Sequence, residues 1–155
     1  YLRTAITYLP DAEFVGTRYS TVPGSNCAGI VPPTPGPTCK LVTGNRLPYA
    51  PEWVWSASIG YDWNKIVSAE VEAQYTDEMF TDDLETVPVS ADGQRGRIGS
   101  ALIWNATVNF NIPETPLTAY VTVKNVFDEV YVVDQTRGML PGAPRMIQAG
   151  ISIKF

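Results

Sequence analysis

The sequence predicts an all-β fold, an antiparallel up-and-down meander of about six strands that forms part of a large transmembrane β-barrel. Two observations indicate this class. Apolar and polar residues alternate with a period of two along several segments, as they do in strands whose two faces meet different surroundings. The connections between these segments are alternately short and long, which is typical of barrel strands that are joined by tight turns at one end and by long loops at the other.

The strand predictions rest on alternation within each segment. In the third segment Val67, Ala69 and Val71 fall on one face, whereas Glu70 and Glu72 fall on the other. The opening segment alternates more loosely than the rest. The six predicted strands span about residues 2–8, 53–61, 67–76, 102–112, 117–124 and 147–155.

The connections predict which strand ends lie together. Short turns are expected at 62–65 and 113–116, and antiparallel neighbours joined in this way leave all long connections on the other side of the sheet. With this alternation the last strand ends on the short-turn side, so Phe155 is expected at the periplasmic rim. The long connections, which we expect to be external loops, are about residues 10–51, 77–100 and 128–144.

The apolar face is predicted to meet lipid, because aromatic residues cluster near the strand ends while Ala, Val and Ile fill the middles. This pattern is similar to two aromatic girdles around an apolar band. The alternative is a soluble sandwich or barrel whose apolar face is a protein core, but Glu70 and Glu72 in mid-strand favour a lumen on the opposite face. The residues expected to face lipid are Trp55, Ala57, Ile59, Val67, Ala69, Val71, Ala106, Val108, Val121, Ile151 and Ile153.

Composition argues against several classes of function. The 155 residues carry a net charge of −5, whereas a nucleic-acid-binding protein should be basic. The chain has no His and only two Cys, so it lacks the commonest general base and cannot assemble a four-ligand structural zinc site. We therefore predict no enzyme activity, no resident metal and no cofactor.

Six strands are too few to close a barrel. The smallest single-chain barrels have about eight strands, and an open sheet would leave unpaired backbone groups in hydrocarbon at several kcal/mol each. We therefore expect a partner strand for each edge of the sheet. The last strand should pair with residues 117–127 on one side and with the first strand of the barrel, outside this sequence, on the other.

Three motifs near the C-terminal end resemble a known family. They are Val-Lys-Asn-Val-Phe-Asp-Glu-Val-Tyr at 123–131, Gly-Ala-Pro-Arg at 142–145, and the final aromatic Phe155. Their order resembles the end of a TonB-dependent outer-membrane receptor, and the lead-in at 44–52 is similar to the approach to a barrel strand in that family. The segment at 134–142 resembles the ferric-dicitrate branch of these receptors.

This resemblance implies that residues 1–155 are the C-terminal part of a receptor barrel in the Gram-negative outer membrane. It implies a plug and further strands outside this sequence, together with a region that engages the inner-membrane TonB energy-coupling complex. The implied function is active transport of a scarce, bulky substrate, such as a ferric chelate or siderophore, into the periplasm. The alternatives are a passive porin or adhesin-type barrel and a soluble ligand-binding β domain.

Two sets of residues are candidate sites in the expected external loops. Cys27 and Cys39 flank a Pro-rich stretch of an exported protein, and we expect them to form a disulfide that stabilises the loop by roughly 3 kcal/mol. Arg95, Arg97 and Arg137 are candidate ligand contacts, because a guanidinium matches the carboxylates of an anionic chelate. The alternative for these arginines is pairing with nearby Asp and Glu residues of the loops.

Overall fold

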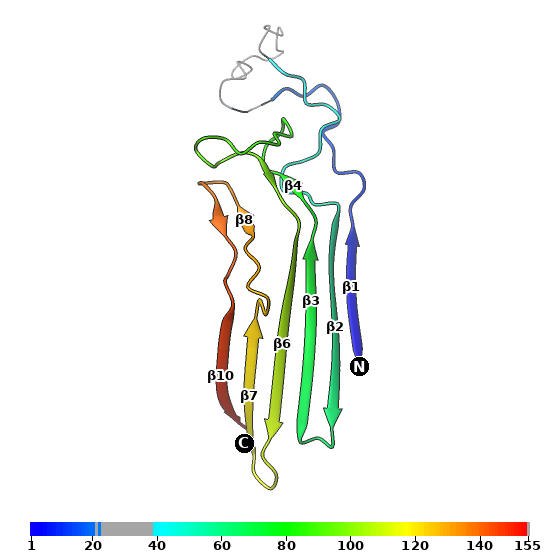
Figure 1. Cartoon of the computed structure of the whole chain (residues 1–155). Helices are drawn as coiled ribbons and strands as arrows, with labels where there is room; N and C mark the ends of the chain where they lie inside the picture. Colours follow the sequence, from blue (N-terminus) through cyan, green and yellow to red (C-terminus); the bar gives the residue numbers. More distant parts are fainter. Residues whose placement is uncertain (21, 23–38, 155) are drawn as a thin grey trace.

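The computed structural model describes residues 1–20, 22 and 39–154, and its largest sheet is antiparallel and has six strands (Figure 1). The six strands of this sheet are neighbours in chain order, which confirms the predicted meander. They are β1 (Leu2–Tyr8), β2 (Trp53–Trp63), β3 (Val67–Thr76), β6 (Ala101–Asn111), β7 (Leu117–Lys124) and β10 (Met146–Ile153).

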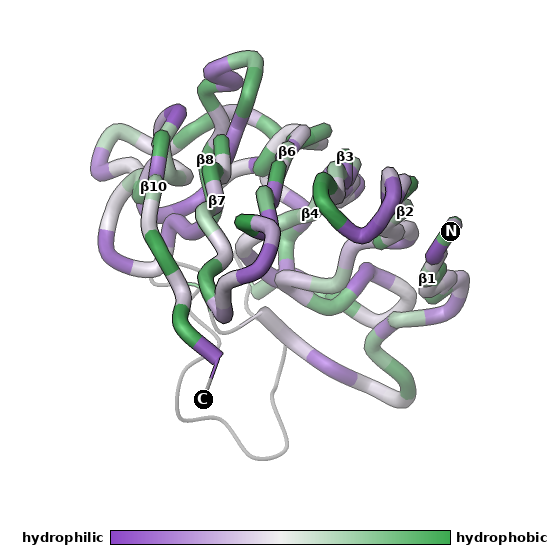
Figure 2. The backbone as a smooth tube through the Cα atoms, turned by 90° about the horizontal axis from the view of Figure 1, so that it is seen from below, coloured by the Kyte–Doolittle hydropathy of each residue, from purple (hydrophilic) through white to green (hydrophobic). Residues whose placement is uncertain are grey.

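The register brings like faces together across neighbouring strands. Val71 of β3 lies opposite Ile59 of β2, and the adjacent Glu72 lies opposite Ser58. Because successive side chains of a strand point to opposite faces, this register gives the whole sheet one apolar and one polar face. Seen from below, the strands follow one another along an arc from β10 to β1 (Figure 2).

The apolar face is open. None of the eleven residues predicted to face lipid is buried, and Ile59 and Ile151 are 64% and 68% exposed. Among the described residues only one apolar side chain of the sheet, Ala73, is fully buried. A soluble domain would bury this face in a core, so the exposure agrees with strands that face hydrocarbon.

Hydrogen bonds join the strands across the polar face. The Asn105 amide donates to Glu72 Oε2 at 2.9 Å, and the hydroxyls of Thr107 and Thr122 lie 3.1 Å apart. Asn105 is 7% exposed although it belongs to a single-layered sheet. The polar side chains therefore satisfy one another on the face that the sequence assigns to the lumen.

The edges of the sheet are β1 and β10. As predicted, β10 pairs antiparallel with β7, from Met146 opposite Lys124 to Ile153 opposite Leu117. Neither edge has a second partner among the described residues. In hydrocarbon each edge needs a partner strand, because unpaired backbone groups there are costly.

The three long connections lie together at one end of the sheet, and the short turns lie at the other (Figure 1). We call them loop 1 (residues 9–52), loop 2 (residues 77–100) and loop 3 (residues 125–145). Their external position stays a prediction. The disulfide of Cys27 with Cys39 also stays a prediction, because Cys27, like Phe155, lies outside the described residues.

Two small sheets lie within the loops. In loop 2, β4 (Met79–Phe80) pairs with β5 (Arg97–Ile98), and in loop 3, β8 (Val132–Asp134) pairs with β9 (Leu140–Pro141). The described part of the chain contains no helix that is long and apolar enough to cross a membrane.

Candidate functional site

Loops 1 and 2 are joined by side-chain hydrogen bonds. The Ser20 hydroxyl donates to Asp83 Oδ1 at 2.7 Å, and the Asn45 amide donates to the Asp83 carbonyl at 2.8 Å. The backbone N–H of Arg46 donates to Glu85 Oε1 at 2.6 Å. These bonds connect segments about forty to sixty residues apart in the sequence, and they fix how the two loops lie against each other.

The Arg46 side chain closes the stem of loop 1. Its guanidinium donates to the carbonyls of Leu9 and Pro10 at the start of the loop, and to the carbonyl of Ala50 near its end. Arg46 belongs to the motif at 44–52 that resembles the family lead-in. Its donors are used by the backbone, so its role is to hold the loop rather than to bind a ligand.

Asn125 closes the stem of loop 3. Its side chain donates to the carbonyls of Glu129 and Ala143 at 2.9 and 3.0 Å, and it accepts the Glu129 N–H at 2.9 Å. Its own N–H donates to Asn105 on the neighbouring strand β6. Asn125 is 3% exposed and has a φ of 50°, a left-handed conformation that Asn tolerates better than most residues.

Asp128 and Arg145 complete the same stem. Asp128 Oδ1 accepts the Arg145 N–H at 2.8 Å, and the Arg145 guanidinium lies 3.9 Å from Asp128 Oδ2. Both side chains are about half exposed, so the ion pair itself contributes little. The C-terminal family motifs thus supply the hydrogen bonds at the base of loop 3.

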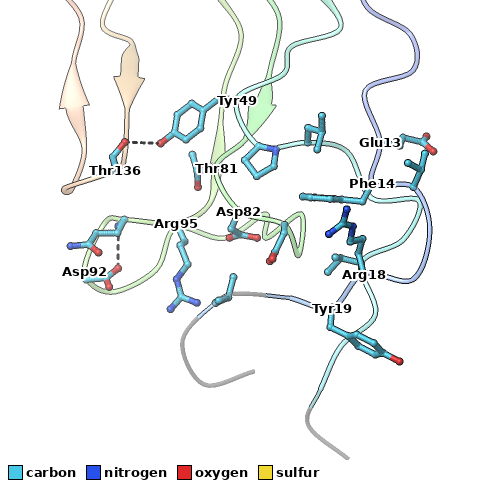
Figure 3. Close-up of a pocket in the computed structure, with 17 residues that line it drawn as sticks. Glu13, Phe14, Arg18, Tyr19, Tyr49, Thr81, Asp82, Asp92, Arg95 and Thr136 are labelled. Carbon is cyan, nitrogen blue, oxygen red and sulfur yellow. Dashed lines mark hydrogen bonds between the residues drawn. The ribbon is translucent and has the colours of Figure 1, made fainter. Parts of the chain in front are cut away.

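All three loops contribute to one pocket of about 860 Å³ (Figure 3). Phe14 and Tyr19 come from loop 1, Asp82 from loop 2 and Thr136 from loop 3. Tyr49, at the end of loop 1, also lines the pocket. This size lies within the range of pockets that hold small-molecule ligands.

Two guanidiniums line this pocket, those of Arg18 and Arg95. Neither side chain forms an ion pair or hydrogen bond with any described residue. Arg95 is half-buried and is held by its backbone, whose N–H donates to Ser90 Oγ at 3.0 Å. The two side chains offer charged donors to an anionic group.

The other two predicted arginines lie elsewhere. The Arg97 guanidinium donates to Glu78 Oε1 at 2.9 Å in an exposed ion pair, which is the loop pairing that we considered as the alternative. Arg137 is exposed and does not line the pocket, although its neighbour Thr136 does. The structure therefore brings only Arg95 of the predicted three into the pocket.

Two acidic residues of the pocket stabilise turns of loop 2. Asp82 Oδ1 accepts the N–H of Leu84 and both the N–H and hydroxyl of Thr86. The Asp92 carboxylate accepts the Ser90 hydroxyl, which is the main reason that the pKa of Asp92 lies below its ordinary value. These carboxylates shape the loop, and no group of three or more metal-ligating side chains occurs among the described residues.

Arg18 and Tyr49 also line the pocket, and neither was predicted from the sequence. Neither stands in a motif with a recognised chemical role, and the two are separated by about thirty residues of loop 1. Arg18 is placed by bonds to Val42 and Thr43 within loop 1, and Tyr49 by a bond to Phe80 of loop 2. Such bonds between distant residues leave no periodic signal in the sequence.

A family model described as TonB-dependent receptor-like, β-barrel, matches residues 7–126. The chain belongs to this family. Members are outer-membrane proteins of Gram-negative bacteria, and they are transporters rather than enzymes. The predicted family, fold class, localisation and lack of enzyme activity are thereby confirmed.

Solved receptor structures agree with this assignment. The ferric citrate transporter FecA is 26% identical over 76% of this chain, with a TM-score of 0.67. The siderophore receptor PiuA from Acinetobacter baumannii shares the fold over 99% of the chain, with a TM-score of 0.73 at 15% identity. The ferric-catecholate import receptor Fiu from E. coli K12 shares it over 76%, with a TM-score of 0.60 at 20% identity.

The chain spans only part of these receptors. It covers 19% of FecA, 19% of PiuA and 17% of Fiu. The matches therefore establish the barrel family and its fold, whereas transport and its substrate concern the whole receptor.

Proposed function

We propose that this chain is part of a TonB-dependent receptor that carries a ferric chelate or siderophore across the outer membrane. The observation that supports this function best is the pocket among the three loops, with the guanidiniums of Arg18 and Arg95, which form no ion pair or hydrogen bond with the residues that the structure describes. The similarity to FecA, a ferric citrate transporter, agrees with an anionic ferric complex as the substrate.

Arg18 and Arg95 are the proposed ligand contacts. A charge-assisted hydrogen bond from a guanidinium to a carboxylate contributes roughly 1.5–3 kcal/mol, more than a neutral hydrogen bond. Phe14 and Tyr19 add apolar surface on the loop 1 side of the same pocket. The pocket thus combines charge with surface for the organic part of a bulky complex.

The remaining partners follow from the family. We propose that the apolar face of the sheet contacts outer-membrane lipid, and that Glu72 and its polar neighbours face a plug within the barrel. Energy for release of the substrate comes from the inner-membrane TonB complex, which acts through a part of the receptor outside this sequence.

The test uses the full-length receptor with ferric citrate and a ferric catecholate as probes. For whichever probe binds, Arg18→Ala and Arg95→Ala should each weaken binding about tenfold, which corresponds to ~1.4 kcal/mol. Arg137→Ala is the matched control, since Arg137 is exposed and lies outside the pocket. Equal losses in all three variants, or no loss, would contradict the assignment of the pocket.

Uptake measurements separate active transport from a passive barrel. In cells that lack the TonB complex, binding of the ferric probe to the receptor should persist, whereas its accumulation in the periplasm should stop. Accumulation that continues without the complex would favour the passive porin.

A further inference from the structure

We infer that Tyr49 is a positioning residue that holds loop 3 against the pocket and links ligand occupancy to the order of loop 3. This inference rests on the proposed function, because the linkage requires a ligand in the pocket. The Tyr49 side chain then provides the contact between the pocket and Asp134 of loop 3, which lies 85 residues further along the chain.

Tyr49 contacts all three parts of the loop assembly. It belongs to loop 1, and its N–H donates to the Phe80 carbonyl of loop 2 at 2.8 Å. Its hydroxyl donates to Asp134 Oδ1 of loop 3 at 2.8 Å and accepts the Gln135 N–H at 3.2 Å. Figure 3 shows the Tyr49 side chain reaching toward Thr136, whose Oγ1 lies 3.4 Å from the hydroxyl.

The backbone of Tyr49 is held in an unusual conformation. Its φ of 58° lies in the left-handed region, which a bulky residue adopts rarely and at a cost of about 1–3 kcal/mol. Such a conformation persists only where the surrounding contacts determine it. Here the bonds to Phe80 and Asp134 hold both ends of the residue, so the ring has a defined direction.

The segment of loop 3 that Tyr49 binds is itself well ordered by local bonds. Asp134 Oδ1 also accepts the N–H and the hydroxyl of Thr136, and the next side chain, Gln135, is only 1% exposed. The hydroxyl of Tyr49 therefore docks a preformed turn. Loss of the hydroxyl should release this turn from the pocket without destroying the turn.

A ligand in the pocket should favour the docked arrangement. Both Tyr49 and Thr136 line the pocket, so a ligand that packs between loops contacts both sides of the hydrogen bond. A ligand that binds the docked state better shifts the equilibrium toward it, and the coupling is reciprocal. Weakening the docking must then weaken binding, because less of the receptor is in the competent state.

The direct test is Tyr49→Phe in the full-length receptor, which keeps the ring and removes the hydroxyl. Tyr61→Phe is the matched control: Tyr61 is exposed in β2, outside the pocket, and its hydroxyl makes no hydrogen bond to a described residue. Hydrogen exchange of residues 132–138 and affinity for ferric citrate and a ferric catecholate are measured for both. We expect Tyr49→Phe to speed exchange about fivefold and to weaken binding about fivefold, and Tyr61→Phe to change either by less than twofold.

A second variant distinguishes docking from a general loss of stability. Asp134→Ala removes the acceptor of the same bond, so the double variant with Tyr49→Phe should weaken binding no more than the stronger single variant. In the wild type, ligand should slow exchange at 132–138 but not at the distant turn 112–116. Independent, multiplying losses in the double variant would overturn the inference.

The failures of the two proposals are distinguishable. If neither ferric probe binds the wild type, the proposed substrate class fails, while the exchange of 132–138 in ligand-free Tyr49→Phe still tests the docking. If a probe binds the wild type and Tyr49→Phe binds it equally well, the linkage is wrong and the proposed function stands.

Discussion

The sheet and the loops of this chain differ in which side chains they bury and which they expose. In the sheet, large apolar residues such as Ile59, Val121 and Ile151 are exposed, and Ala73 is the one apolar side chain that the described structure buries there. In the loops, by contrast, several polar and apolar side chains are buried although no large sheet or helix covers them. The buried loop residues include Ala12, Ser20, Val42, Asp82, Asp83, Ile98 and Gln135.

This difference shows where each region obtains its stability. The sheet has continuous backbone ladders, and its outer face depends on the medium around it. The loops have few ladders and depend on hydrogen bonds between distant side chains, such as those of Asp83 and Tyr49. The sheet is therefore suited to a fixed wall, and the loops are suited to a binding site whose parts can shift relative to one another.

A charged substitution on the apolar face of the sheet should have the largest effect on the stability of the receptor. Val121 lies in the middle of β7 and is 47% exposed, so Val121→Arg places a guanidinium in hydrocarbon. We expect the free energy of unfolding of the receptor in lipid to fall by about 2–4 kcal/mol. Gln148→Arg, on the polar face of the adjacent strand β10, is the control and should change it by less than ~0.5 kcal/mol. Equal effects would mean that the two faces meet the same medium.

A substitution in the stem of loop 3 should have the next largest effect on stability. Asn125→Ala removes three side-chain hydrogen bonds at a buried site, and we expect a loss of about 2–3 kcal/mol in denaturant unfolding. Asn64→Ala is the matched control, because Asn64 has the same φ of 50° but is exposed in a short turn. The difference between the two variants isolates the hydrogen bonds from the backbone preference. A difference near zero would show that the stem does not hold loop 3.

The six main strands were predictable because apolar and polar residues alternate over seven to eleven residues in each of them. The small strands β4 and β8 were not, since two or three residues carry no period. The family motifs at 123–131 and 142–145 were recognised, but their role at the stem of loop 3 became clear only from the bonds of Asn125. Arg95 was predicted from its charge, whereas Arg18 reaches the pocket through hydrogen bonds to Val42 and Thr43, far along the same loop.

The smallest expected effect is that of pH on the stability of loop 3 between pH 7 and about 4. The Thr136 hydroxyl and N–H, together with the Tyr49 hydroxyl, lower the pKa of Asp134 to about 2. A lowered pKa in the folded state stabilises the docked turn above the ordinary pKa of the carboxyl, and this contribution is lost as the pH falls through about 2. Protection factors of residues 132–138 should thus be constant from pH 7 to about 4 and fall below that. A loss near pH 6 would implicate another group.

The most direct test measures whether neighbouring residues on one strand alternate between lipid and the barrel interior. Spin labels at 106, 107, 108 and 109 of β6 are examined singly in the full-length receptor in lipid bilayers, with Cys27 and Cys39 replaced by serine. Because Ala106 and Val108 lie on the apolar face, collisions with dissolved oxygen should be frequent at 106 and 108 and rare at 107 and 109. Equal collision rates at all four positions, or frequent collisions at 107 and 109, would contradict a sheet whose apolar face meets lipid.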